Sequence, residues 1–148
     1  MGRKPMKKSI LFACIGNCCR SQMAEGFAKK IAGERYDVYS AGTRPAGFVH
    51  PDAIAVMHEV GIDISSQYSK GFNQVPVKSF DHFVTMGCLP AEVSTKAGGD
   101  TCPVVAAKNR IDWQIEDPIG QPIEVFRRVR DEIEAKVKEL LAQIMQSS

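Results

Sequence analysis

The sequence predicts an α/β fold with three layers, in which a four-stranded parallel sheet is flanked by helices. Apolar runs with the length of buried strands alternate along the chain with stretches whose apolar residues recur every three or four positions. This alternation is typical of a parallel sheet that is covered on both faces. The chain has 148 residues, enough for one domain with a hydrophobic core, and we expect that domain to span residues 8–148.

The first strand and the first helix are predicted on either side of a short loop. Residues 10–13 are apolar and have the composition of a buried strand, which residues 14–21 interrupt. From residue 23 to residue 31 the apolar side chains lie three or four apart, which predicts one face of a helix that ends at Gly33. In an open parallel sheet, the loop after such a strand lies where ligands bind.

The other elements are predicted from the same periodicities. The last helix has the clearest pattern, because apolar residues repeat along its whole length at intervals of three or four. The predicted strands cover residues 36–41, 80–86 and 110–115, and the predicted helices cover residues 51–60 and 123–144. The predicted loops cover residues 42–47, residues 63–76 with a short helical turn, and residues 87–109.

Composition and charge narrow the class of protein. The formal net charge of +2 is too small to predict binding to nucleic acid or to membranes, and no apolar run approaches the length of a membrane span. Five cysteines without an export signal indicate working thiols in the cytoplasm rather than structural disulfides. No two of the cysteines have the C-x2-C spacing, so we expect no zinc site. We expect residues 1–7 to be a flexible leader.

The loop after the first strand predicts an oxyanion site beside a nucleophile. A loop that leads into a helix directs several backbone N–H groups into one concavity, and the helix dipole adds positive partial charge there. Gly16 and Asn17 tolerate the left-handed conformations that such a curl needs, and Arg20 offers a planar fork for two oxygens. Cys14 lies at the mouth, so we expect it to be a thiolate at neutral pH. The predicted oxyanion-binding residues, which we call the cradle, are Cys14, Ile15, Gly16, Asn17, Cys18, Cys19, Arg20 and Ser21.

These residues carry a resemblance to a known family. The spacing Cys-x5-Arg-Ser between a strand and a helix is a specific signal, and residues 14–25 resemble the signature of the low-molecular-weight tyrosine phosphatase superfamily. Residues 21–26 resemble its arsenate reductase branch, of the thioredoxin-coupled type. The similarity runs from about Lys8 to the C-terminus and implies the fold of this superfamily, which has a flavodoxin-like topology.

The resemblance implies reduction of arsenate to arsenite by a relay of cysteines, for arsenic detoxification. The cradle with Arg20 would bind arsenate, Cys14 would attack the arsenic, and Asp117 would protonate the departing oxygen as a general acid. Cys88 and Cys102 match the second and third cysteines of the branch, whose thiols form a disulfide that thioredoxin reduces. Their separation is longer than is usual in the branch, which indicates an insertion.

A second set of residues matches positions that support the loop in this family. They are Asn17, Ser21, Glu25, Ser40 and Lys70. In some relatives this region holds a potassium ion; where an Asp would complete that site, this chain has Lys70, and we expect its ammonium group to replace the ion. Cys19 matches a loop cysteine that need not take part in the chemistry. Cys18 stands where serine is common, and its thiol could pair with Cys14 under oxidation.

The resemblance also implies the ligands and partners. We expect arsenate as substrate, with phosphate or sulfate as competing oxyanions, and thioredoxin or a low-molecular-weight thiol system as reductant. We expect no bound metal or cofactor, and a monomer in the cytoplasm.

Three alternatives stay open on the sequence. A phosphatase would use Cys14, Arg20 and Asp117 to hydrolyse a phosphoester through a phosphocysteine, although Ile119 and Gly120 stand where phosphatases have aromatic residues. A non-catalytic redox or oxyanion sensor would use the thiols to change a contact with a partner. A reductase of another type would replace the third thiol, or both downstream thiols, with glutathione or mycothiol.

Overall fold

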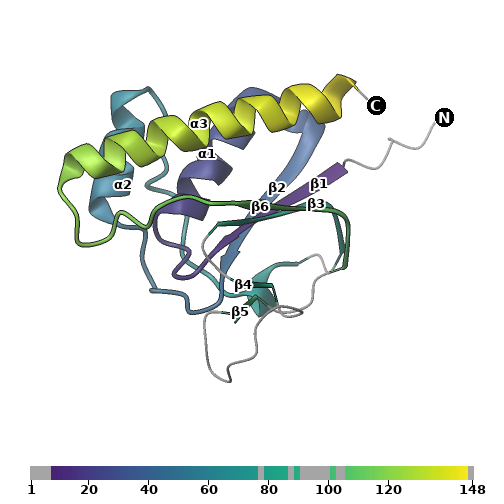
Figure 1. The fold of residues 1–148 in the computed structure, drawn as a ribbon, viewed down its shortest axis with the longest axis horizontal. Helices are drawn as coiled ribbons and strands as arrows, with labels where there is room; N and C mark the ends of the chain where they lie inside the picture. The colour runs from purple at the N-terminus through teal and green to yellow at the C-terminus, as the bar shows by residue number, and fades with distance from the viewer. Residues whose placement is uncertain (1–7, 77–78, 87–88, 91–100, 103–105, 147–148) are drawn as a thin grey trace.

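The computed structural model describes residues 8–76, 79–86, 89–90, 101–102 and 106–146. Its main sheet has four strands in the order β2-β1-β3-β6, and each neighbouring pair is parallel. The strands are β1 (Lys8–Cys14), β2 (Tyr36–Gly42), β3 (Ser79–Met86) and β6 (Ala106–Trp113). The predicted four-stranded parallel sheet is therefore confirmed (Figure 1). The predicted leader, residues 1–7, lies outside the described residues.

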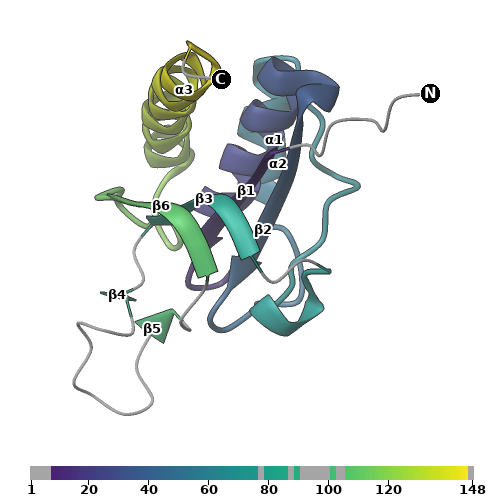
Figure 2. The ribbon, with the colours of Figure 1, turned by 90° about the vertical axis from the view of Figure 1, so that its right-hand side faces the viewer.

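Three α-helices gather on one face of this sheet, and a short 3-10 helix lies on the other. The α-helices are α1 (Arg20–Ala32), α2 (Pro51–Glu59) and α3 (Ile123–Gln146), and Figure 2 shows the sheet between them and η2 (Phe72–Gln74). A further 3-10 turn, η1 (Gly33–Arg35), follows α1. The predicted helices and the helical turn within residues 63–76 are thus confirmed. None of the helices in the described ranges is long and apolar enough to cross a membrane.

β1 is buried on both faces, which explains its unbroken apolar sequence. Ile10 and Phe12 pack into the larger apolar cluster under the helices, whereas Leu11 and Ala13 belong to the smaller cluster on the opposite face. All four side chains are fully buried. A central strand of this kind, paired on both sides, gives the loop at its end a rigid base.

β6 corrects the predicted position of the fourth strand. The strand begins at Ala106 instead of Arg110 and ends at Trp113, so residues 106–109, which we predicted as loop, are paired with β3. β6 is an edge strand whose residues are mostly exposed and half of them polar, so hydrophobic periodicity does not mark its beginning. Trp113 at its end packs against Phe12, with ring centroids 5.9 Å apart.

A second, two-stranded sheet lies inside the segment that we predicted as loop 87–109. β4 (Leu89–Pro90) pairs in parallel with β5 (Thr101–Cys102), and Pro90 lies opposite Cys102 in the register. This pairing brings the backbone at both ends of the apparent insertion side by side. The predicted loop is therefore wrong for these short strands, which are too brief to show a periodicity.

Candidate active site

The loop of the cradle connects the end of β1 to the start of α1 and is fixed from outside by its carbonyl groups. The carbonyl oxygens of Cys14, Ile15, Gly16 and Cys18 accept hydrogen bonds from backbone N–H groups of residues 43–50, at 2.8–3.3 Å. The Asn17 carbonyl accepts from the side chain of Gln22 instead, at 3.0 Å. Because the N–H of each trans peptide unit points opposite to its C=O, the N–H groups of residues 15–19 face the inside of the curl. The loop therefore has the form of an anion cradle.

Two residues allow the loop to curl so tightly. Asn17 has a left-handed backbone with φ 47°, a conformation that asparagine tolerates better than most side chains. Gly42 at the end of β2 lies against the loop, where an added Cβ would come within 2.6 Å of the Ile15 carbonyl oxygen and 2.8 Å of the Asn17 nitrogen. Any larger residue at position 42 would therefore push the loop out of place.

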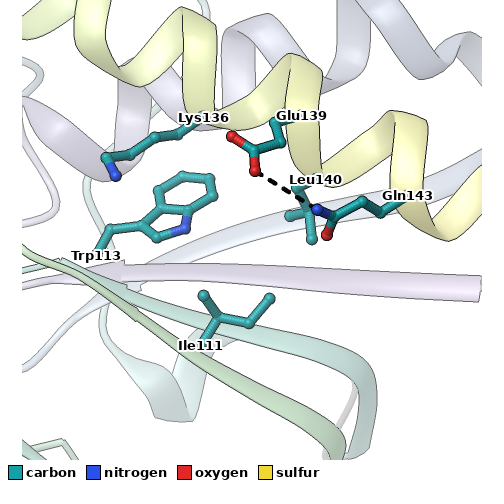
Figure 3. Close-up of a pocket in the computed structure, with 6 residues that line it drawn as sticks. All are labelled: Ile111, Trp113, Lys136, Glu139, Leu140 and Gln143. Carbon is teal, nitrogen blue, oxygen red and sulfur yellow. Dashed lines mark hydrogen bonds between the residues drawn. The ribbon is translucent and has the colours of Figure 1, made fainter.

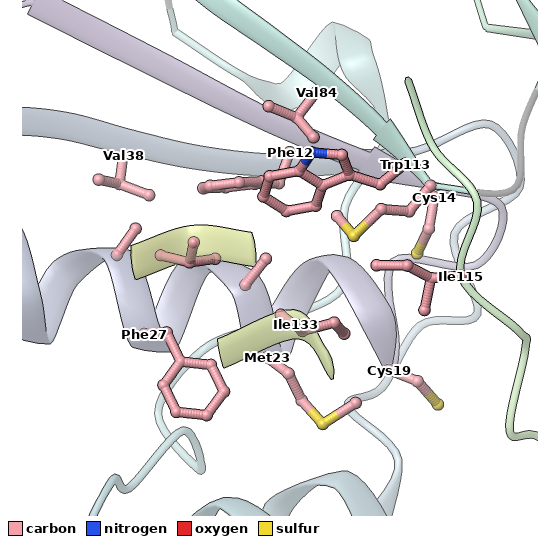
Figure 4. Packing of buried hydrophobic residues seen from close by; sticks show 14 of the residues in the cluster. Phe12, Cys14, Cys19, Met23, Phe27, Val38, Val84, Trp113, Ile115 and Ile133 are labelled. Atoms are coloured by element: carbon pink, nitrogen blue, oxygen red, sulfur yellow. The ribbon is translucent and has the colours of Figure 1, made fainter. Parts of the chain in front are cut away.

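Cys14 ends β1, and its sulfur lies 2.9 Å from the hydroxyl oxygen of Ser21. The Asn17 side-chain nitrogen donates to that same oxygen at 2.7 Å. Because the Asn17 side-chain nitrogen can only donate, the Ser21 oxygen accepts there, and the hydroxyl proton is left to point at the sulfur. Figure 4 shows Cys14 with Cys19 and Ile115 at one end of the larger apolar cluster, near the start of α1.

Arg20 and Asp117 form an ion pair at the end of the cradle where α1 begins. Arg20 is the first residue of α1 and is buried; its Nη1 donates to the Ile115 carbonyl at 3.1 Å. Its Nη2 lies 3.6 Å from Asp117 Oδ2, on the segment that follows β6. The other Asp117 oxygen accepts from the Ile119 N–H at 3.1 Å, and the side chain is 44% exposed. The structure thus brings together two residues that lie far apart in the sequence.

A buried network beneath the loop centres on Gln22, a residue to which the sequence analysis gave no role. Its amide nitrogen donates to the Asn17 carbonyl, to Asn17 Oδ1 and to the Tyr68 carbonyl, at 2.9–3.0 Å. Its Oε1 accepts from Gln67 Nε2 at 2.7 Å, and the residue is fully buried. The only sequence signal was the position of Gln22 inside the signature run, because a polar residue in a helix usually faces solvent.

A second buried network surrounds Glu25 on the next turn of α1. Ser40 Oγ donates to Glu25 Oε1 at 2.5 Å, and Lys29 Nζ lies 2.5 Å from Oε2. Lys70 Nζ lies 3.8 Å from Glu25 Oε1 and donates to Ser40 Oγ at 3.4 Å and to the Tyr68 carbonyl at 3.1 Å. The pKa of Lys70 lies below its usual value, because the effect of burial outweighs the opposing effect of the Glu25 charge. The five predicted support residues therefore form two groups, Asn17 with Ser21 in the cradle and Glu25 with Ser40 and Lys70 beside it. The Lys70 N–H joins the groups by donating to Asn17 Oδ1 at 2.9 Å.

Cys18 and Cys19 are both free, buried thiols with their sulfurs 3.7 Å apart. The hydrogen bond with Cys19 lowers the pKa of the Cys18 thiol, and the Arg20 charge adds to this, whereas burial and Asp117 raise it. The hydrogen bond with Cys18, followed by burial, raises the pKa of the Cys19 thiol far above its ordinary value. The two thiols therefore differ in acidity, and Cys18 is the more acidic of the two.

The structure describes less of the two remaining predicted thiols. Cys88 lies outside the described residues, and Cys102 is described only by its backbone in β5. Among the described residues, no group of three His, Cys, Asp or Glu side chains is arranged to hold a metal ion.

A separate pocket of about 280 Å³ lies between β6 and α3 (Figure 3). It is lined by Ile111, Trp113, Lys136, Glu139, Leu140 and Gln143. None of these residues belongs to the cradle or to its supporting networks.

Sequence comparisons agree with this geometry. The family model described as low molecular weight phosphotyrosine protein phosphatase matches residues 9–148. An arsenate reductase of Halalkalibacterium halodurans is 45% identical over 139 residues, which cover 89% of this chain and 94% of the relative. A glutaredoxin arsenate reductase of Synechocystis sp. is 42% identical over 141 residues, which cover 93% and 98% of the two chains.

Solved structures of the same kind resemble the chain. An arsenate reductase in the phosphate binding state superposes with a TM-score of 0.77 at 39% identity, covering 93% of this chain and 98% of that one. A thioredoxin-dependent arsenate reductase of Corynebacterium glutamicum gives a TM-score of 0.76 at 29% identity, covering 97% of this chain and 65% of that one.

Proposed function

This chain belongs to the low molecular weight phosphotyrosine protein phosphatase family, and we propose that within it the chain is an arsenate reductase that works through a relay of thiols. The observation that carries the proposal is the meeting of a thiol, a buried guanidinium and a carboxyl at one loop. Cys14 is the first residue of the cradle, with its sulfur 2.9 Å from the Ser21 hydroxyl oxygen, and Arg20, near the other end of the loop, lies 3.6 Å from Asp117. The arsenate reductases with 42–45% identity support the choice of substrate.

The cradle supplies binding and the first bond. The N–H groups of residues 15–19 and the Arg20 fork bind the oxygens of arsenate, which is a tetrahedral anion like phosphate. The Ser21 hydroxyl, 2.9 Å from the sulfur, donates to Cys14 and stabilises its anion. Cys14 attacks arsenic, an S–As bond forms, and Asp117 gives its proton to the oxygen that leaves as water.

Two further thiols carry out the reduction. The Cys88 thiolate attacks the Cys14 sulfur, a disulfide forms, and the electron pair of the broken S–As bond stays with arsenic, which leaves as trivalent arsenite. Cys102 then attacks Cys88, which frees Cys14 and leaves a Cys88–Cys102 disulfide. The pairing of Pro90 with Cys102 supports this step, because it holds the backbone of the third thiol beside the strand that follows the second.

An external thiol must then reduce the Cys88–Cys102 disulfide. A thioredoxin-dependent relative supports thioredoxin in this role, and the glutaredoxin type of another relative keeps the glutathione system as the alternative. Both are dithiol or thiol donors that act by the same exchange chemistry.

Phosphoester hydrolysis is the second candidate, because the family description names it and the same Cys14, Arg20 and Asp117 would carry it. Such an enzyme binds an aromatic ring beside the cradle. The residues after Asp117-Pro118 offer none: Ile119 is exposed, and Gly120 turns the chain with φ 82°. We therefore expect hydrolysis only as a weak by-product of the shared cradle.

A single turnover without external reductant tests the proposal. Fully reduced protein is mixed with arsenate, arsenite is quantified, and disulfides are mapped by peptide mass. We expect nearly one arsenite per chain with a Cys88–Cys102 disulfide from the native sequence, none from Cys14→Ser, and a trapped Cys14–Cys88 disulfide from Cys102→Ser.

Three results would contradict the proposal. Full turnover by Cys14→Ser would remove the nucleophile from the mechanism. Arsenite that appears only after a small thiol is added would remove Cys88 and Cys102 from the relay. Phosphoester hydrolysis that is faster than arsenate reduction in the same sample would favour the phosphatase.

A further inference from the structure

Two thiols of the cradle have no part in the proposed relay. Cys18 and Cys19 are neighbours in the sequence, and side chains of neighbouring residues usually diverge. Here the turn into α1 brings their sulfurs to 3.7 Å on one side of the chain. The backbone holds them there, because the Cys18 carbonyl accepts from the His50 N–H and the Cys19 carbonyl accepts from the Met23 N–H, both at 2.9 Å.

The separation of the two sulfurs fits a shared bond partner. Sulfurs in a disulfide lie about 2.05 Å apart, so this pair would have to move to form one. Trivalent arsenic carries a lone pair and forms pyramidal bonds, so two sulfurs bound to it lie closer together than at a tetrahedral zinc site. At 3.7 Å the two sulfurs are already in contact, so a small approach lets both bond to a single soft atom.

The pair also lies on the same loop as the reacting centre. The Cys18 thiol is within the electrostatic influence of Arg20 and Asp117, and the Cys19 thiol is within that of Cys14. Cys14 is as buried as both of them, at 2% exposure against 3% and 1%, so the three thiols of the loop are shielded from solvent to the same degree.

We propose that Cys18 and Cys19 form a dithiol site for trivalent arsenic. The proposal rests on the proposed function in one respect, because that reaction releases trivalent arsenic beside the pair. Arsenite, As(OH)₃, exchanges two hydroxyl groups for the two sulfurs. Each As–S bond that forms releases one hydroxyl with the thiol proton as water, and arsenic stays trivalent, so no oxidant or reductant is consumed.

The site would hold product inside the cradle and so slow the next turnover. Arsenic bridged between Cys18 and Cys19 would occupy space at the loop that the next arsenate needs, and added arsenite would inhibit the enzyme. Replacement of one sulfur would leave a single bond and lose about a hundredfold or more in affinity, because the second thiol acts at a high effective concentration.

Binding is measured with arsenite and phenylarsine oxide on the full chain, independently of arsenate turnover. The variant Cys14→Ser, Cys88→Ser, Cys102→Ser retains only the pair. We expect it to bind one arsenic per chain by intact mass, to keep it in excess glutathione and to lose it to dithiothreitol. Adding Cys18→Ser, or separately Cys19→Ser, abolishes the adduct.

A measurement on the native sequence covers the case in which the triple variant does not fold. Reduced protein is treated with arsenite and then alkylated, and protected cysteines are mapped by fragmentation of the peptide that contains residues 9–20. We expect Cys18 and Cys19 to be protected. Protection of other cysteines alone, or protection of Cys19 that survives Cys18→Ser, would overturn the proposal.

The outcome is separable from that of the proposed function. Arsenite is added directly, so a chain that fails to reduce arsenate can still bind trivalent arsenic at the pair. Conversely, normal arsenate reduction without protection of Cys18 and Cys19 would leave the reductase proposal standing and refute the dithiol site.

Discussion

Cys14 and Asp117, the two groups to which the proposed mechanism assigns bond making and proton transfer, are held in opposite ways. Cys14 is 2% exposed, ends a central strand and lies above two buried polar networks. Asp117 is 44% exposed, lies on an irregular segment after the edge strand β6, and is tied to the cradle by one ion pair of 3.6 Å to Arg20.

This difference fits the separate roles of the two groups, because the nucleophile needs a fixed position and the general acid does not. The nucleophile must face an oxyanion whose position is set by backbone N–H groups, so small displacements reduce its reactivity. A general acid that remains half exposed can exchange its proton with water between turnovers. Substitutions beneath Cys14 should therefore change stability and reactivity together, whereas substitution of Asp117 should change reactivity alone.

The largest effect is expected at Asp117, the less firmly held of the two groups. Asp117→Asn removes the proton donor while it keeps the shape, and we expect the arsenate turnover rate to fall by about 10²–10⁴-fold. The melting temperature should change little, because Asp117 is 44% exposed and Arg20 keeps its hydrogen bond to the Ile115 carbonyl. Single-turnover kinetics and a thermal melt on the same preparation provide the measurement.

Two outcomes would contradict this view of Asp117. An unchanged arsenate response in Asp117→Asn would favour the sensor alternative, in which this carboxyl has no chemical role. A large loss of stability would show that Asp117 is as firmly built into the fold as Cys14.

In the buried network that supports the cradle, Lys70→Met should cost about 3 kcal/mol of unfolding free energy. The substitution leaves Glu25 with one cation fewer in a buried site. Lys29 provides a matched control, since it pairs with the same carboxylate but is 52% exposed. Lys29→Met should cost no more than about 1 kcal/mol. Urea denaturation measures both, and equal costs would show that burial of Lys70 does not govern the network.

A smaller effect beneath the cradle is expected from Gln22→Met. This nearly isosteric change leaves the Tyr68 carbonyl and Gln67 without a partner that Gln22 supplied, which should cost about 1–3 kcal/mol. The loop would also lose its clamp on the Asn17 carbonyl, so alkylation of Cys14 by iodoacetamide should become slower. The exposed Gln143→Met is the control, and equal alkylation rates would show that Gln22 supports the fold but not the nucleophile.

The sequence was sufficient to predict the elements on either side of the cradle. β1 and α1 were predictable because one is buried on both faces and the other has a clear helical face, and the spacing of Cys14 and Arg20 between them marks the loop. The start of β6 was not predictable, because an exposed edge strand with polar residues has no apolar period. Asp117 was found only through its resemblance to a family motif.

The supporting networks show a second limit of sequence reasoning. Ser40, Glu25 and Lys70 could be named by resemblance, but the contacts among them depend on how β2 and the segment before η2 approach α1. Gln22 was missed because its burial depends on Tyr68 and Gln67, which lie far along the chain. Long-range hydrogen bonds of this kind leave no periodic pattern in the sequence.

The smallest expected effect concerns potassium. The Lys70 ammonium lies among the Ser40 hydroxyl, the Tyr68 carbonyl and Glu25 Oε1, at 3.1–3.8 Å, so it already supplies the positive charge there and repels a second cation. We expect equal melting temperatures in KCl and NaCl at the same ionic strength. Lys70→Asp exchanges the ammonium for a carboxylate and should create a preference for potassium; an ion at a hundred times its Kd would add about 2.7 kcal/mol. A potassium preference in the native sequence would mean that the ammonium does not take the place of the ion, and the buried network that supports the cradle would then depend on salt.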